Sequence, residues 1–195
     1  MAASPRSFGV IVEGTYDEPV YAELIRRICG GEPPTVVFRP TTGSIHVQKY
    51  TGLLRSLEHV ILGNPVDRAL IIRDSDQRDP AAVESKIRDG IRANFAFPGG
   101  IEVHAVRREM ETWMLADDQA ISRVAERSGG RVVPPVHETL EDIAHPKERF
   151  QKVLRSAGLL YLSTVCGEIA RELDLATLRY RCPGFVAFER KVLRP

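Results

Sequence analysis

The chain has 195 residues, of which 43% are hydrophobic and 27% are charged, the composition of one ordinary folded domain. This excludes a disordered tail protein, and a chain of this length forms a hydrophobic core without a disulfide or metal to hold it. The three cysteines are odd in number and far apart, so they predict neither a disulfide framework nor a zinc site and favour a reducing compartment. The first apolar run, Phe8 to Val12, is too short for a signal peptide or a membrane span. We therefore expect a cytoplasmic protein that has no membrane partner.

Positive and negative charges nearly cancel over the whole chain but are unevenly distributed along it. The 27 Lys and Arg exceed the 26 Asp and Glu by one, so the net charge of +1 says nothing about a polyanionic partner. Residues 1–118 hold 14 basic and 17 acidic side chains, a net charge of −3, whereas residues 147–195 hold 10 basic and 5 acidic side chains, a net charge of +5. An acidic body is thus followed by a basic C-terminal segment.

The first 106 residues alternate between two hydrophobic patterns. Apolar, β-branched runs predict four strands, at residues 8–12, 35–38, 69–72 and 101–106. Segments with helical spacing lie between them, at residues 18–28, 46–62 and 80–95. Buried strands separated by helices predict an α/β fold with a mainly parallel four-stranded sheet, covered by helices on both faces. A strand order of 2-1-3-4, as in flavodoxin-like sheets, would make strands 1, 3 and 4 neighbours.

Only helical spacing follows the fourth strand. Helices are predicted at residues 111–128, 147–157, 160–173 and 184–193, with a linker-like stretch rich in Pro and Gly at 129–146. We therefore expect a core at residues 1–118 and a helical C-terminal extension at residues 119–195 packed on that core.

Acidic residues follow three of the four predicted strands, at the edge where parallel α/β sheets bind ligands. The pairs are Glu13 and Asp17 after the first strand, Asp74 and Asp76 after the third, and Glu109 and Glu111 after the fourth. Like charges this close repel one another unless a cation lies between them, and carboxylate oxygens are the ligands that Mg²⁺ prefers. In extended backbone the two aspartates after the third strand would point to the same side and share one site. The pattern predicts a site for Mg²⁺ or Mn²⁺ at this edge.

Each acidic motif also has a structural interpretation. Asp17 suits the N-cap of a helix that begins at Glu18, and Asp79 before Pro80 suits a solvated turn and a helix cap. Glu109 and Glu111 suit a helix N-terminus, where the dipole favours acids. The coincidence of three motifs at three strand ends favours the site.

These residues resemble the TOPRIM domain of topoisomerases, primases, recombination proteins and OLD-type nucleases. That pattern has Glu-Gly after the first strand, Asp-x-Asp after the third and often a further acid after the fourth. Over almost its full length the chain is still more similar to the TOPRIM-like family of domain of unknown function 4276. The residues that carry this likeness are Val12-Glu-Gly-x-x-Asp17, Glu109-x-Glu-x-Trp-x-Leu-x-Asp117, Pro146-Lys147 and Arg181-Cys-Pro-Gly-Phe185-x-x-Phe188. One departure is the pair Arg73 and Arg78, which flank the central aspartates and could balance their charge without a metal.

The resemblance implies a metal-dependent nuclease that hydrolyses phosphodiester bonds in DNA or RNA, in a bacterial anti-phage or DNA-processing system. Glu13 and Asp74 would form its central pair, with Glu13 a metal ligand or the general base. Asp17 and Asp76 would complete one metal site, and Glu109 or Glu111 a second. By analogy with OLD-type nucleases, Lys147 would stabilise the transition state.

A basic segment follows the linker-like stretch. Cations recur there at helical spacing, at Lys147, Arg149, Lys152 and Arg155, and the last three would guide nucleic acid toward the acidic site. Their simpler interpretation is a solvated helix face. Trp113 is expected to anchor the core. The rival function is a non-catalytic module of the same fold, whose acidic rim docks a partner and works with a separate ATPase.

Overall fold

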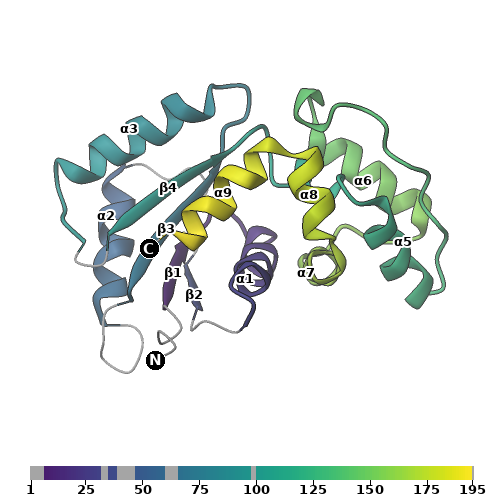
Figure 1. The fold of residues 1–195 in the computed structure, drawn as a ribbon, viewed down its shortest axis with the longest axis horizontal. Helices are drawn as coiled ribbons and strands as arrows, with labels where there is room; N and C mark the ends of the chain where they lie inside the picture. The colour runs from purple at the N-terminus through teal and green to yellow at the C-terminus, as the bar shows by residue number, and fades with distance from the viewer. Residues whose placement is uncertain (1–6, 32–34, 39–46, 60–65, 98–99, 195) are drawn as a thin grey trace.

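The computed structural model describes residues 7–31, 35–38, 47–59, 66–97 and 100–194. Four strands form one parallel sheet in the order β2-β1-β3-β4 (Figure 1). They are β1 (Phe8–Ile11), β2 (Thr35–Phe38), β3 (Arg68–Asp74) and β4 (Ile101–Val106). The order is the one expected from the sequence, and it makes β1, β3 and β4 neighbours. The carboxyl ends of these three strands therefore meet at one edge of the sheet.

Helices follow the first three strands. They are α1 (Asp17–Ile28), α2 (Val47–Ser56) and α3 (Pro80–Arg92), and a short 3₁₀ helix, η1 (Leu57–His59), continues α2. The helix predicted at 46–62 is therefore shorter than expected within the described residues, and positions 46 and 60–62 lie outside them. At the start of α3 the side chain of Asp79 accepts a hydrogen bond from the backbone N–H of Ala82, at 3.0 Å. The interpretation of Asp79 as a helix cap is confirmed.

After β4 the described chain forms helices joined by loops, with more helices than the spacing predicted. These are α4 (Glu111–Met114), α5 (Asp118–Arg127), the 3₁₀ helix η2 (Leu140–Asp142), α6 (Pro146–Ala157), α7 (Ser163–Glu172), α8 (Leu175–Arg181) and α9 (Pro183–Leu193). The single helix predicted at 111–128 is two helices, because Asp117 has extended backbone and caps α5 through the N–H of Ala120. Helix α8 was not predicted, and Asp174 caps its first turn. Among the described helices, none has both the length and the apolar character needed to cross a bilayer.

Helices cover both faces of the sheet. On β3, Leu70 and Ile72 contact the core on the side of α1 and α9, whereas Ala69 and Ile71 contact the core on the side of α2 and α3. This alternation is the period-2 pattern of a strand buried on both faces. The expected α/β class is confirmed.

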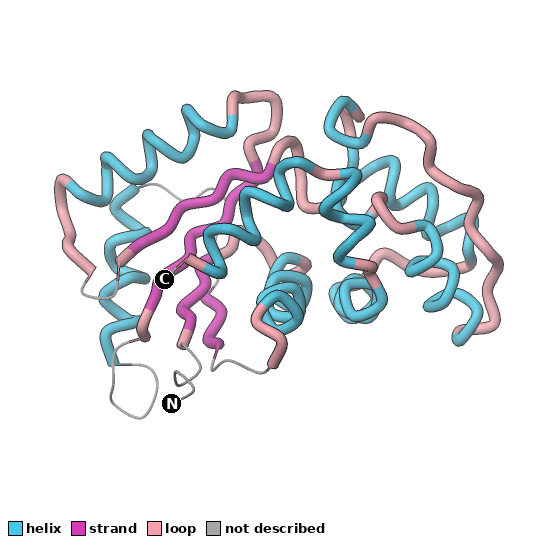
Figure 2. Tube along the Cα trace, in the orientation of Figure 1, coloured by secondary structure: helices cyan, strands magenta, loops and turns pink. Residues whose placement is uncertain are grey.

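The helical C-terminal part shares its core with the sheet. Figure 2 shows the strands gathered in one half of the molecule and helices and loops in the other, with α9 returning alongside β4. Trp113 is 1% exposed and packs against Phe185 and Phe188 of α9, so the expectation that it anchors the core is confirmed. The ammonium group of Lys191 donates to the carbonyl of Val103 at 2.7 Å, which ties α9 to β4. The helices after Asp118 are therefore held against the sheet by apolar packing and by polar contacts.

Candidate functional site

A pocket of about 220 Å³ lies at the carboxyl edge of the sheet, where β1, β3 and β4 end. We call it the acidic pocket, because five carboxylates line it. Its lining residues are Glu13, Gly14, Tyr16, Asp17, Asp74, Glu109, Glu111, Lys147 and Tyr161. The structure thus brings together five of the six acids expected there, and Lys147 with them. The strand order explains why these acids lie together. Each acid lies at the carboxyl end of β1, β3 or β4 or a few residues beyond it, and these three strands are neighbours.

Glu13 and Asp74 link the ends of the three strands. One carboxylate oxygen of Glu13 accepts a hydrogen bond from the backbone N–H of Asp74 at 3.2 Å. The other lies 3.1 Å from the Nε atom of Arg73. Asp74 in turn accepts from the backbone N–H of Met110 at 3.1 Å. Each carboxylate is therefore held at a defined place by the backbone of the next strand end.

Asp17 closes the turn between β1 and α1. Its side chain accepts from the backbone N–H of Gly14 at 2.7 Å, and Tyr16 rather than Asp17 occupies the N-cap position of α1. The capping interpretation of Asp17 is therefore wrong. The residue lies in the first helical turn and reaches back over the turn that begins at Glu13, which places its carboxylate in the pocket.

The C-terminal half of the chain supplies the other wall of the pocket. The backbone N–H of Lys147 donates to Glu109 at 2.8 Å, and the hydroxyl of Tyr161 donates a short hydrogen bond to Glu111. The rings of Tyr16 and Tyr161 stack with their centroids 4.3 Å apart. The ammonium group of Lys147 lies 5.9 and 5.6 Å from these two ring centroids, within the range of a cation–π contact. The start of α6 and the segment before α7 are thereby fixed against the acidic residues.

The acidic pocket is electrostatically strained. Burial raises the pKa of Asp17 to about 6, and repulsion from Glu111 and Glu13 adds to this effect. Burial also raises the pKa of Asp74 well above its usual range, with Asp17 and Glu111 the largest repulsive neighbours. The pKa of Glu13 is raised by burial and lowered in part by Arg73. A nearby cation would relieve this repulsion.

Asp76, the sixth expected acid, does not line the acidic pocket. Its backbone φ is +55°, so the extended conformation that would align it with Asp74 is absent. The carboxylate is exposed and forms an ion pair with Arg78 at 2.9 Å. The expectation that Asp74 and Asp76 share one site is therefore corrected, because the chain leaves the strand conformation between them.

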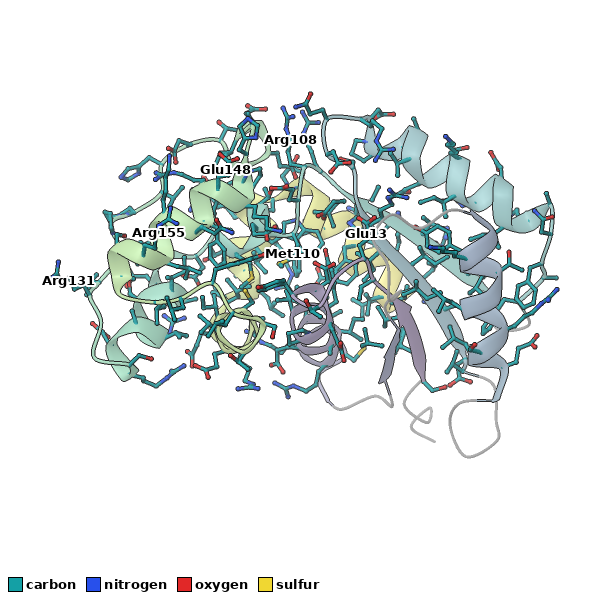
Figure 3. All side chains as sticks on the ribbon, turned by 180° about the vertical axis from the view of Figure 1, so that it is seen from behind. Glu13, Arg108, Met110, Arg131, Glu148 and Arg155 are labelled. Carbon is teal, nitrogen blue, oxygen red and sulfur yellow. The ribbon has the colours of Figure 1, made fainter. Side chains whose placement is uncertain are left out.

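The other three cations of α6 lie away from the acidic pocket. Lys152 and Arg155 are exposed, and Arg149 is paired with Glu138 at 3.1 Å. In Figure 3 Arg155 projects from α6 well apart from Glu13. Because each residue turns the helix by about 100°, residues 149, 152 and 155 are spaced about 60° apart around α6, and Lys147 lies about 80° beyond Arg155. Their role in guiding nucleic acid stays a prediction.

Comparison with known protein families identifies the family of the chain. A family model described as a domain of unknown function (DUF4276) matches residues 12–193. The chain belongs to this family. Neither the curated proteins nor the solved structures contain a match to this chain.

Two aromatic residues of the pocket in this DUF4276 chain were not singled out from the sequence. Tyr16 lies between Gly14 and Asp17, so its position inside the first acidic motif could have indicated that it lines the pocket. Tyr161 is 50 residues from Glu111, its hydrogen-bond partner, and no spacing rule connects the two. Only the docking of the segment before α7 brings Tyr161 to the pocket.

The donor chemistry of the acidic pocket fits a hard divalent cation, since five carboxylates offer the oxygen ligands that Mg²⁺ and Mn²⁺ prefer. Among the described residues, no three His, Cys, Asp or Glu side chains are already grouped as the ligands of one ion. The carboxylates instead accept hydrogen bonds from separate protein donors, such as Gly14 for Asp17 and Tyr161 for Glu111. Binding of one ion by three of these carboxylates would therefore require their side chains to move closer together.

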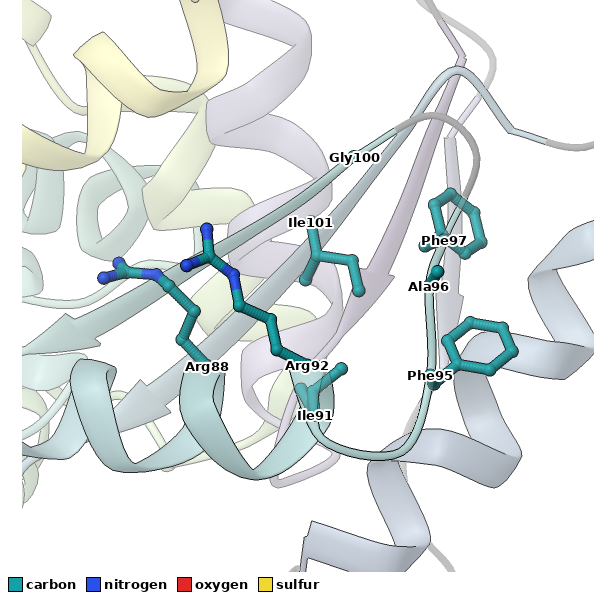
Figure 4. A pocket seen from close by; sticks show the side chains of 8 residues that line it. All are labelled: Arg88, Ile91, Arg92, Phe95, Ala96, Phe97, Gly100 and Ile101. Atoms are coloured by element: carbon teal, nitrogen blue, oxygen red, sulfur yellow. The ribbon is translucent and has the colours of Figure 1, made fainter.

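A pocket at the opposite edge of the sheet differs in chemistry. It has a volume of about 280 Å³ and lies where β4 begins, beside the end of α3. Figure 4 shows its lining, with the rings of Phe95 and Phe97 on one side and the guanidinium groups of Arg88 and Arg92 on the other. No acidic residue lines it among those the structure describes. Of these two pockets, the acidic one is therefore the one at the edge where α/β sheets bind ligands.

Proposed function

We propose that this DUF4276 chain is a TOPRIM-type nuclease that uses Mg²⁺ or Mn²⁺ to hydrolyse phosphodiester bonds in nucleic acid. The observation that carries the proposal is the acidic pocket itself, in which carboxylates from the ends of three adjacent parallel strands meet one lysine. Glu13-Gly14, Asp74 and Glu109-x-Glu111 lie at the strand ends where the TOPRIM pattern has its acids. The departure at Asp76 leaves this arrangement with a single aspartate from β3.

The cofactor follows from the charge of the pocket. Glu13, Asp17, Asp74, Glu109 and Glu111 would hold the ion. Burial raises the pKa values of Glu13, Asp17, Asp74 and Glu111, so their charged forms are costly when no cation is near. The bound ion would neutralise the scissile phosphate and lower the pKa of an attacking water.

Three side chains of the pocket would have separate roles in the reaction. Glu13 is partly buried, and its raised pKa makes it a better proton acceptor than an exposed carboxylate, which suits a general base. Of the described residues that line the pocket, Lys147 is the one cation, and it can stabilise the negative charge that develops on a phosphate. Tyr161 orients Glu111 through its hydrogen bond and is a positioning residue.

The test is a cleavage assay on labelled single-stranded DNA, double-stranded DNA and RNA, with Mg²⁺, Mn²⁺ or EDTA. We expect cleavage of at least one substrate that requires the ion and is lost in Asp74→Asn. Calorimetric titration with Mn²⁺ gives a second measurement, in which the wild type binds the ion and Asp74→Asn binds it more weakly. Absence of both cleavage and ion binding would overturn the proposal and favour an acidic rim that docks a protein partner.

A further inference from the structure

A second pocket lies at the same end of β3 and β4 as the acidic pocket. Its volume is about 230 Å³, and we call it the arginine pocket because three arginines line it. Its lining residues are Asp76, Gln77, Arg78, Asp79, Pro80, Arg107 and Arg108. Asp76 is two residues beyond Asp74, and Arg108 directly precedes Glu109, so the two pockets are built from adjacent positions of the same two connections. Figure 3 shows Arg108 at the rim of the molecule above Glu13.

The three arginines differ in how far their charge is already neutralised. Arg78 forms a close ion pair with Asp76, at 2.9 Å. Arg107 donates a long hydrogen bond to the carbonyl of Glu141 at 3.4 Å. Its contacts with the carboxylates of Glu141 and Asp142 are long, at 3.8 and 4.0 Å, and half of its side chain is exposed. Arg108 forms no ion pair with any residue that the structure describes. The pocket therefore presents guanidinium charge that the protein leaves available.

The backbone holds Arg108 in a conformation that a side chain rarely adopts. Its φ is +67°, and Asp76, opposite it, has a φ of +55°. The two residues form an isolated antiparallel bridge, in which the N–H of Asp76 donates to the carbonyl of Arg108 at 3.0 Å. The N–H of Arg108 donates to the hydroxyl of Ser75, which is completely buried. A left-handed backbone is unfavourable for residues with a side chain, and such strain is found most often where function requires a particular geometry.

We propose that the arginine pocket binds a backbone phosphate of the nucleic-acid strand whose neighbouring phosphodiester bond lies in the acidic pocket. This inference rests on the proposed nuclease function and names how its substrate is held. A strand that approaches five carboxylates needs a compensating cation nearby, because the acidic pocket by itself repels a polyanion. A guanidinium group binds phosphate through two parallel hydrogen bonds, which fixes the strand in orientation as well as in place.

The phosphate of a longer strand fits this arrangement better than free phosphate does. The two pockets share no lining residue although both are built from the ends of β3 and β4, so one ligand that occupies both must carry more than one phosphate. Arg108 and Arg107 would contact the flanking phosphate, while Arg78 keeps Asp76 neutralised.

The experiment measures binding without turnover. Fluorescence anisotropy of a labelled single-stranded DNA 12-mer in EDTA, at several salt concentrations, is compared for the wild type, Arg108→Asn, Arg107→Gln and Arg131→Gln. Asn tolerates a left-handed backbone, so Arg108→Asn removes the charge with little added strain. Arg131 is an exposed arginine far from both pockets, and its variant is the control (Figure 3).

We expect Arg108→Asn to weaken oligonucleotide binding about tenfold and to lower the salt slope by about one, as the loss of one phosphate contact requires. Arg107→Gln should have a smaller effect in the same direction, and Arg131→Gln none. Unchanged binding in both Arg108→Asn and Arg107→Gln would overturn the inference, even if the wild type cleaves nucleic acid. Loss of binding in Arg108→Asn while the wild type shows no cleavage would instead count against the proposed function alone.

A competition arm separates the two sources of phosphate. Unlabelled 12-mer should displace the probe at micromolar concentration, whereas inorganic phosphate and a mononucleotide should not do so at the same concentration. Equal displacement by inorganic phosphate would overturn the assignment to a nucleic-acid strand.

Discussion

Two pockets of similar size lie at the ends of β3 and β4, with volumes of about 220 and 230 Å³, yet their charges are opposite. In the acidic pocket, carboxylates from three strand ends face one another with a single lysine. In the arginine pocket, three guanidinium groups face two carboxylates, one paired with Arg78 and the other capping α3. The acidic pocket therefore has an excess of negative charge, and the arginine pocket has an excess of positive charge.

The difference arises from a two-residue step at the end of β3. Asp74 is still in the strand and points its carboxylate into the acidic pocket, whereas Asp76 has left-handed backbone and contributes to the arginine pocket. Identical side chains two positions apart thus take different parts in the site. Backbone conformation, rather than residue type, therefore assigns each aspartate to its pocket.

The strongest test of this division substitutes the two aspartates in turn. Asp74→Asn should lower metal-dependent cleavage by about 100-fold or more, since it removes a carboxylate from the centre of the acidic pocket. Its thermal midpoint without metal should stay the same or rise, because a repelling charge is removed. The matched control is Asp76→Asn, which should change cleavage only a few-fold. Equal losses in the two variants would contradict the assignment of the aspartates to different pockets.

Lys147 provides a second test, because it is the one cation lining the acidic pocket among the described residues. Lys147→Gln should lower kcat about 10- to 100-fold with a much smaller change in KM, as expected of a group that acts mainly in the transition state. Lys152→Gln, on the exposed face of the same helix, is the control. A rise in KM with unchanged kcat would show that Lys147 serves binding instead.

The exposed cations of α6 offer a second surface on which nucleic acid could bind, besides the arginine pocket. Replacing Arg149, Lys152 and Arg155 together with Glu should weaken oligonucleotide binding, and each lost phosphate contact should lower the salt slope by about one. Arg149 is already paired with Glu138, so the three positions should contribute fewer than three contacts. Charge reversal at the exposed Arg131 is the control. Unchanged binding at low salt would identify this face as a solvated helix surface.

The smallest expected effect concerns stability without metal. The pKa of Asp17 rises from its usual value of 3.8 to about 6 on folding, so its charge opposes folding. This penalty is absent below about pH 4, develops as the pH rises to about 6, and is fully present at pH 7. Asp17→Asn, which keeps an oxygen that can accept from Gly14, should raise the free energy of unfolding at pH 7 by about 1 kcal/mol.

Chemical denaturation of wild type and Asp17→Asn at pH 4 and pH 7, in EDTA, checks this pH dependence. The gain should shrink toward zero at the lower pH. Glu18→Gln removes a charge from the same helical turn outside the pocket and controls for the helix dipole. A gain in Asp17→Asn that is equal at both pH values would show that its cause is not the raised pKa.

Local patterns in the sequence were sufficient to predict much of the fold and part of the site. Hydrophobic periodicity depends on a residue's near neighbours, so it predicted the four strands and the helices that follow them. It also placed Glu13, Asp74 and Glu109 just beyond strand ends, which meet at one edge in any parallel sheet of this order.

The tertiary structure decided what depends on contacts between distant segments. The left-handed turn at Asp76 exists through its bridge to Arg108, 32 residues away, and no local pattern predicts that bridge. Tyr161 reaches Glu111 only because α6 and α7 dock beside the sheet. Periodicity shows which face of a segment is buried, but the partner it meets is set by how the whole core packs. Local sequence patterns therefore specified the sheet and the acids at its edge, whereas contacts between distant segments divided that edge into two pockets of opposite charge.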